Sequence, residues 1–172
     1  TTDVLVLTPD SINIPGGIIP TDVATMPAGL AAITSFAQML IRACKDYLQI
    51  DPTELRMSLQ PFTSNNGVSQ RIFIADVLEN GSGYAKLIAD GETLKSILVQ
   101  MIDTTGKRLS TPSLHPQCDT SCPSCLRSYE NRGSHYLLNW RLALDAAELI
   151  LGIGLDMNRW IPRGEALVDD FL

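Results

Sequence analysis

The sequence is short of features that several large classes of protein need. Aromatic residues make up only 6% of the chain, and no apolar run approaches the length of about 20 residues that a membrane-spanning helix requires. The N-terminus lacks the charged segment and following apolar stretch of a secretion signal. We therefore expect a cytoplasmic protein that does not contact a membrane.

Positive charge is also in short supply. The 13 lysines and arginines are outnumbered by 19 aspartates and glutamates, so the net charge is −6. This balance argues against general, sequence-independent binding to nucleic acid. Residues 105–145 are the exception, because five basic residues there outnumber three acidic ones.

Apolar residues are abundant enough for one hydrophobic core. They make up 45% of the 172 residues, a length that suits a single domain. Periodicity and turn signals predict a strand at 3–8, a loop at 9–27, a helix at 28–48, strands at 55–62 and 69–77, and helices at 84–102 and 134–151. This order predicts a small α+β domain with a short antiparallel sheet, three main helices and a mostly irregular stretch at 103–134.

Local signals set several boundaries. Asn65-Asn66-Gly67 predicts a hairpin turn. Gly91 indicates a weak point in the second helix, and Ser134 is the expected N-cap of the last helix. Because the chain has no initiator methionine and begins inside a predicted strand, we interpret residues 1–172 as one domain, the C-terminal part of a longer protein. The tail is expected to dock through Trp160, Leu167 and Phe171.

Cysteine is rare but clustered. The chain has four cysteines, and Cys118, Cys122 and Cys125 fall within eight positions. Such a cluster without a secretion signal favours metal over disulfides, and three cysteines cannot all pair among themselves. The Cys122–Cys125 spacing lets two thiolates reach one tetrahedral ion from a tight turn, and Cys118 adds a third. We predict a structural zinc ion in a loop at 115–135; free thiols or a disulfide are the alternative.

A closed structural zinc site needs a fourth ligand. His115 has the best spacing, because it lies three residues before Cys118 and would complete a Cys3His set. His135, at the expected start of the last helix, is the alternative fourth ligand. Cys44 is a third candidate, but it lies on the apolar face of its helix and is better explained as a buried core thiol.

The cluster does not fit the catalytic patterns in which cysteine and histidine recur. A zinc deaminase needs H-x-E and P-C-x-x-C, whereas Pro-Gln follows His115 and Tyr-Leu follows His135. A redox C-x-x-C follows a strand and opens a helix, whereas this one lies in a predicted loop. No P-loop, H-E-x-x-H or G-x-S-x-G is present. We therefore expect no catalytic residues and no enzymatic activity in this chain.

The segment after the cysteines is basic. Arg127, Arg132 and Arg141 are the candidate nucleic-acid contacts, because arginines presented by a metal-braced loop can reach phosphates. The alternative is that they pair with acidic neighbours and only stabilise the loop. Tyr129 and Asn131 either contact bases or brace the loop through hydrogen bonds.

The stretch from Cys118 to Asp145 resembles the zinc-binding domain of MrfA-type helicases and their relatives. The similarity rests on the C-x3-C-x2-C-L-R-S-Y-x-N run, the later His135 and the helix sequence Leu-Asn-Trp-Arg-Leu-Ala-Leu-Asp. Residues 72–76 and the glycine turn at 81–85 also resemble the family. Within this group, the sequences Arg-Ser-Tyr-Glu-Asn and Trp-Arg-Leu-Ala-Leu-Asp are most similar to those of the DrmB subunits of the DISARM anti-phage system.

The resemblance implies zinc as the cofactor, a helicase-like partner subunit that binds DNA, and a part in antiviral defence. Many relatives carry four cysteines where this chain has three. The chain lacks helicase motor motifs, so ATPase activity is not implied for it. We expect a non-catalytic module that supports a helicase partner and meets DNA through the complex. The alternatives are the C-terminal domain of a DNA-repair helicase and part of a nucleic-acid hydrolase.

Overall fold

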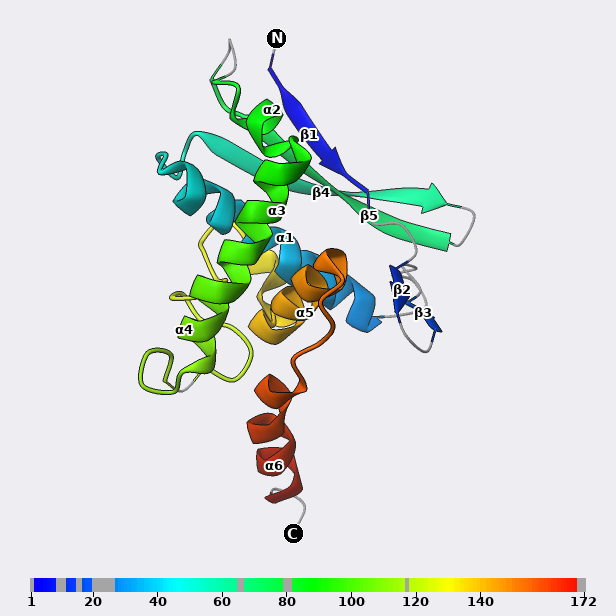
Figure 1. Cartoon of the computed structure of the whole chain (residues 1–172), viewed down its shortest axis with the longest axis vertical. Coiled ribbons are helices and arrows are strands. Elements are labelled where there is room, and N and C mark those ends of the chain that lie inside the picture. The colour runs from blue at the N-terminus through cyan, green and yellow to red at the C-terminus, as the bar shows by residue number, and fades with distance from the viewer. Residues whose placement is uncertain are drawn as a thin grey trace.

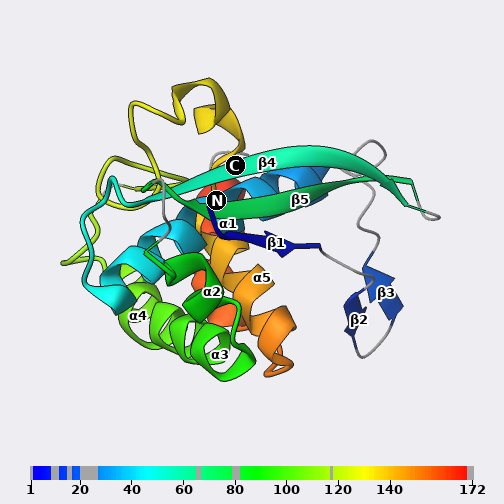
Figure 2. The same cartoon turned by 90° about the horizontal axis from the view of Figure 1, so that it is seen from above.

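Helix α1 (Pro27–Leu48) is the element around which the others pack in this computed structural model (Figure 1). The main sheet lies on one side of α1, and helices α3 (Gly91–Gln100) and α5 (Trp140–Leu151) lie on the other (Figure 2). The predicted helix is confirmed, because α1 buries one apolar face that includes Phe36, Ala37, Leu40, Ile41 and Cys44. The structure describes residues 2–8, 12–14, 17–19, 27–64, 67–78, 82–116 and 118–169.

The main sheet has three antiparallel strands in the order β1-β5-β4. Strands β4 (Leu55–Ser64) and β5 (Gly67–Asp76) pair along their whole length, ending with Ser64 opposite Gly67. This register confirms the predicted hairpin, although Asn65 and Asn66 themselves lie outside the described residues. Strand β1 (Val4–Leu7) pairs with the other edge of β5. The α+β fold class with a short antiparallel sheet is therefore confirmed.

The stretch predicted as one loop, 9–27, contains two short strands. Strands β2 (Ile12–Ile14) and β3 (Gly17–Ile19) pair antiparallel, with Ile12 opposite Ile19. Isoleucine favours extended backbone, and in these triplets that preference outweighs the nearby prolines and glycines. The prediction of an uninterrupted loop is therefore wrong.

The second predicted helix is interrupted where Gly91 marks a weak point. Helix α2 (Tyr84–Ile88) ends, and α3 starts after Asp90, whose carboxylate accepts a hydrogen bond from the Thr93 N–H as an N-cap. The turn before α2 is fixed by the buried Asp76 carboxylate, which accepts hydrogen bonds from the N–H groups of Gly83 and Ala85. Gly83 has φ +77°, a left-handed conformation that suits glycine.

Helical structure continues further than the sequence predicts. From α3 the chain passes through a π-helical segment, η1 (Met101–Gly106), into α4 (Lys107–Ser110), so the first part of the stretch expected to be mostly irregular, residues 103–110, is helical. Gly106 does not break this path. A Cβ atom there would lie 3.3 Å from Cδ2 of Leu144, so the glycine allows α5 to pack closely against the π-helical segment.

The last predicted helix begins later than expected. Residues Arg132–Leu137 form a 3-10 helix, η2, and α5 starts only after Asn139, whose side chain accepts a hydrogen bond from the Arg141 N–H. Ser134 is therefore not its N-cap. Ser35 on α1 fixes the break, because its hydroxyl donates to the Leu137 carbonyl and accepts from the Asn139 N–H.

The C-terminal segment forms a 3-10 turn, η3 (Met157–Trp160), and then α6 (Ile161–Asp169), which points away from the body (Figure 1). Trp160 docks as predicted, since its indole N–H donates to the Asp145 carboxylate. Leu167 is 48% exposed and does not pack against the core that the described residues form, so its predicted docking is wrong, and Phe171 lies outside the described residues. None of the described helices is long and apolar enough to cross a membrane.

Candidate metal centre

The three clustered cysteines meet one histidine. Ligand atoms of His115, Cys118, Cys122 and Cys125 all lie within 4.8 Å of one another. The Sγ atoms of Cys118 and Cys125 are 3.8 Å apart, and His115 Nε2 lies 3.3 Å from Cys122 Sγ. Tetrahedral zinc with Zn–S bonds of about 2.3 Å separates its sulfur ligands by about 3.8 Å. The spacing of these four side chains therefore fits a zinc ion.

A tight turn presents two of the thiols. The N–H groups of Cys125, Leu126 and Arg127 all donate to the carbonyl of Cys122, which closes the C-x-x-C knuckle. The Cys122 N–H donates to the sulfur of Cys125 at 3.0 Å, the contact that stabilises a thiolate ligand. Leu126, directly after the knuckle, is fully buried and anchors the turn in the core.

The helical extension through α4 positions the histidine. His115 Nδ1 lies 3.2 Å from the carbonyl oxygen of Leu109, which lies in α4. A carbonyl only accepts, so the ring proton lies on Nδ1 and the lone pair of Nε2 faces the cysteines. The ring is buried and packs edge-on against Trp140, with centroids 5.8 Å apart.

The other two candidates for the fourth ligand lie outside this cluster. His135 Nε2 contacts the Ser128 carbonyl at 3.0 Å and Asn131 Oδ1 at 2.9 Å, so the ring braces the turn after the knuckle. Cys44 is fully buried in the core, and burial raises the pKa of its thiol to about 12. A thiol with that pKa stays protonated and behaves as an apolar side chain.

Electrostatics also favour a cation among these thiols. Burial and the neighbouring cysteines raise the pKa of Cys118, and burial is the main cause of the raised pKa of Cys125. Burial also acts on Cys122, but hydrogen bonds with His115 and the other two thiols outweigh it and lower the pKa to about 6. Three thiolates this close repel one another unless a cation lies between them, and a zinc ion supplies that charge.

Arg42 on α1 supports the loop from outside and was not found from the sequence. Its guanidinium donates to the carbonyl of Cys125 and, at 2.9 Å, to that of Arg127. Arg108 donates to the neighbouring carbonyl of Ser124 at 3.3 Å. A Cys3His zinc site carries a net charge of about −1, so the two arginines also compensate the charge of the site. The only sequence signal was an arginine within the apolar face of a helix.

Arg141 lies in the interior, and of the two roles that the sequence left open for it, nucleic-acid contact and loop stabilisation, its contacts match the second. Its guanidinium stacks on Trp140 and donates to the carbonyls of Asp119 and Arg159. Trp140 in turn donates its indole N–H to the Cys118 carbonyl at 3.4 Å. Arg141 therefore holds the metal loop, residues 115–135, against α5, which is the loop-stabilising role that the alternative interpretation gave it.

Arg127 and Arg132 differ from Arg141. Arg127 donates to the Ser121 hydroxyl, Arg132 is exposed, and neither forms an ion pair with a described residue. Asn131 braces the loop as one interpretation predicted, because its buried amide donates to the Leu126 carbonyl and its Oδ1 accepts from the Ser128 N–H. Tyr129 does not share that role.

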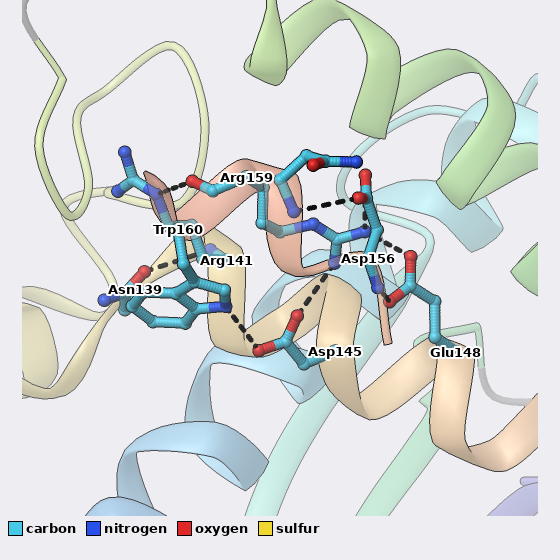
Figure 3. A network of polar contacts seen from close by, with 8 residues as sticks. Asn139, Arg141, Asp145, Glu148, Asp156, Arg159 and Trp160 are labelled. Atoms are coloured by element: carbon cyan, nitrogen blue, oxygen red, sulfur yellow. Dashed lines mark hydrogen bonds and ion pairs between the residues drawn. The ribbon is translucent and has the colours of Figure 1, made fainter. Parts of the chain in front are cut away.

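A buried polar network connects the metal loop to the C-terminal segment (Figure 3). Arg159 forms ion pairs with Asp145, at 2.9 Å, and with Glu148, both on α5. Its carbonyl accepts the hydrogen bond from Arg141, and the Asp156 N–H donates to Glu148. This network was not predicted from the sequence, in which its only signal is two carboxylates three residues apart on one helix.

The fold and the Cys3His geometry together define a small zinc-binding domain. A family model described as the MrfA Zn-binding domain matches residues 36–126, more than half of the chain. The chain therefore belongs to the MrfA zinc-binding domain family. No curated protein and no solved structure matches the chain.

The geometry separates the two histidines experimentally. We expect His115→Ala to weaken zinc binding by at least about 100-fold, because loss of a ligand exceeds the 10- to 100-fold cost of losing a supporting contact. His135→Ala should keep zinc affinity and lose about 1 kcal/mol of stability through its hydrogen bonds. The zinc affinity of both variants is measured by competition with a chromophoric zinc chelator. A larger loss of zinc affinity in His135→Ala would show that His135 is the fourth ligand.

Proposed function

We propose that the chain is a non-catalytic accessory module of a cytoplasmic, helicase-linked DNA-processing system. Membership of the MrfA zinc-binding domain family is the observation that carries this proposal. The link to a helicase comes from the sequence resemblance, which is to the zinc-binding domain of MrfA-type helicases. The zinc loop supports the proposal as well. Contacts with α1 and α5 hold this loop in place, so the role of the metal is to keep the surface of the loop in a fixed shape.

The closed ligand set argues against a catalytic metal. Catalytic zinc keeps one position for water, whereas three thiolates and an imidazole fill a tetrahedral site. The carboxylates nearest in sequence do not supply a general base. Asp119 pairs with Arg141 and Arg163, and Glu130 is exposed and is not among the clustered ligand side chains. A nucleic-acid hydrolase is therefore the weaker alternative.

At the finest level we propose a subunit of the DrmB type, acting with a helicase-like partner in defence against foreign DNA. The resemblance of the Arg-Ser-Tyr-Glu-Asn and Trp-Arg-Leu-Ala-Leu-Asp stretches supports this proposal. These stretches contain Asn131, Arg141 and Asp145, which stabilise the loop and its link to α5. The C-terminal domain of a DNA-repair helicase has the same requirements and is the second candidate.

Co-expression with the helicase-like subunit from the same host tests the proposal. We expect a stable complex that retains about one zinc ion per chain and binds DNA more tightly than the helicase-like subunit alone. Zinc content, the stoichiometry of the complex and DNA affinity are the measurements. Failure to form the complex would contradict the helicase link, and metal-dependent DNA cleavage by this chain would contradict the non-catalytic role.

A further inference from the structure

Two tyrosines near the metal loop are almost completely exposed. Tyr129 is 81% exposed and Tyr136 is 83% exposed, and neither side chain forms a hydrogen bond with a described residue. An aromatic side chain contributes to stability mainly through the area that it buries. Folding therefore does not explain why tyrosine occupies these two positions.

The backbone beneath the tyrosines is firmly held. Tyr129 lies in the turn that the buried Asn131 closes, and the Arg132 N–H donates to its carbonyl. Tyr136 follows His135, whose ring is bonded to Asn131 and to the Ser128 carbonyl. A side chain on a fixed backbone loses less freedom on binding, so both rings are well placed to contact a ligand.

Positive charge accompanies the aromatic rings. The Arg132 guanidinium lies 4.4 Å from the centroid of the Tyr129 ring. Arg127, two residues before Tyr129, donates to the Ser121 hydroxyl and, like Arg132, forms no ion pair with a described residue. Residues 127–136 contain two arginines, Arg127 and Arg132, and one acidic residue, Glu130. This segment therefore has a surplus of positive charge, although the whole chain is acidic.

We propose that the segment 129–136, with its exposed side chains Tyr129, Arg132 and Tyr136, binds single-stranded nucleic acid by stacking unpaired bases on the two rings. The inference rests on the proposed role of the module in DNA processing and names the form of nucleic acid that it engages. Two exposed rings with an unpaired arginine against one of them match the needs of a single strand, whose bases stack on aromatic rings while arginine contacts the phosphates. Duplex bases are already stacked on their neighbours and offer no free face, so a duplex should bind more weakly.

Fluorescence anisotropy with labelled oligo(dT), and with a duplex of the same length, tests this proposal on the full chain. We expect oligo(dT) to bind more tightly than the duplex. Tyr129→Ala and Tyr136→Ala should each weaken oligo(dT) binding by about 5- to 150-fold. Tyr129→Phe should bind like the wild type, because stacking does not need the hydroxyl. Arg132→Ala should reduce the salt dependence by about 0.7 in log–log slope, the value for one phosphate contact.

Tyr47→Ala provides the matched control, since Tyr47 is an exposed tyrosine on α1, and its oligo(dT) affinity should be unchanged. Zinc content and circular dichroism show that each variant is folded. Equal affinity for the duplex, unchanged affinity in the tyrosine variants, or no oligo(dT) binding by the wild type would each overturn the inference. If the wild type joins the helicase-like subunit but not oligo(dT), the proposed function stands and this inference fails. If the tyrosine variants lose binding to the helicase-like subunit but keep their affinity for oligo(dT), the surface is a protein contact instead.

Discussion

Replacement of Cys122 with serine is expected to remove the zinc ion and to lower the free energy of unfolding by about 4 kcal/mol. That value applies when free zinc is about 1,000-fold above its dissociation constant, because the folded chain alone has the assembled site. Cys122 provides one of four ligands, and its carbonyl also accepts three N–H groups of the knuckle. For a domain of this length the change corresponds to a fall in melting temperature of about 8–16 °C.

Elemental analysis of the purified chain and thermal denaturation measure the two parts of this prediction. Wild-type protein should hold about one zinc ion, and a chelator should lower its melting temperature to that of Cys122→Ser. Cys44→Ala is the matched control, because Cys44 lies in the core outside the cluster and its loss should leave zinc content unchanged. Equal zinc content in Cys122→Ser and wild type would contradict the prediction.

The parts of the site that depend on local sequence were predictable. Cys118, Cys122 and Cys125 are close along the chain, so their spacing alone indicates that three thiolates can reach one ion. The choice between His115 and His135 was not settled by spacing. It depends on where α4 ends, because the Leu109 carbonyl orients the His115 ring, and the sequence predicted irregular chain there.

Contacts between distant segments account for the rest. Arg42 supports the carbonyl of Cys125 from 83 positions away, and Ser35 fixes the start of α5 from 104 positions away. No local pattern reports such pairings, which arise only when α1 packs against the loop. The burial of Arg141 could not be read from the sequence for the same reason, since a charged residue near a loop is usually exposed. Here the carbonyl of Arg159 and the ring of Trp140 make its burial favourable.

The ion-pair network at the C-terminal segment leads to the second large expected effect. Arg159→Met should lower the free energy of unfolding by about 3–5 kcal/mol, because it leaves two buried carboxylates without their cation. The side chains of Arg159 and Glu148 are each only 4% exposed, and that of Asp145 is 16% exposed. The loss should also free η3 and α6 from α5, since Arg159 is the residue that both carboxylates hold.

The pH dependence distinguishes this mechanism from simple loss of packing. Burial raises the pKa of Asp145 even with Arg159 present, and removal of the cation should raise it further. When the folded-state pKa is above the unfolded value, the folded state binds the proton more tightly, so stability decreases as the pH rises through that pKa. Arg159→Met should therefore recover stability on mild acidification, as measured by urea denaturation at a series of pH values.

Arg163→Met is the matched comparison, because Arg163 pairs with the exposed carboxylate of Asp119 at the surface. An ion pair of that kind contributes at most about 1 kcal/mol, so this variant should stay close to wild type and show no recovery in acid. Similar losses in both variants, or a loss in Arg159→Met that does not change with pH, would mean that the buried charges are not what the arginine stabilises. A recovery confined to Arg159→Met would identify the ionised Asp145 carboxylate as a group that depends on the cation of the C-terminal segment.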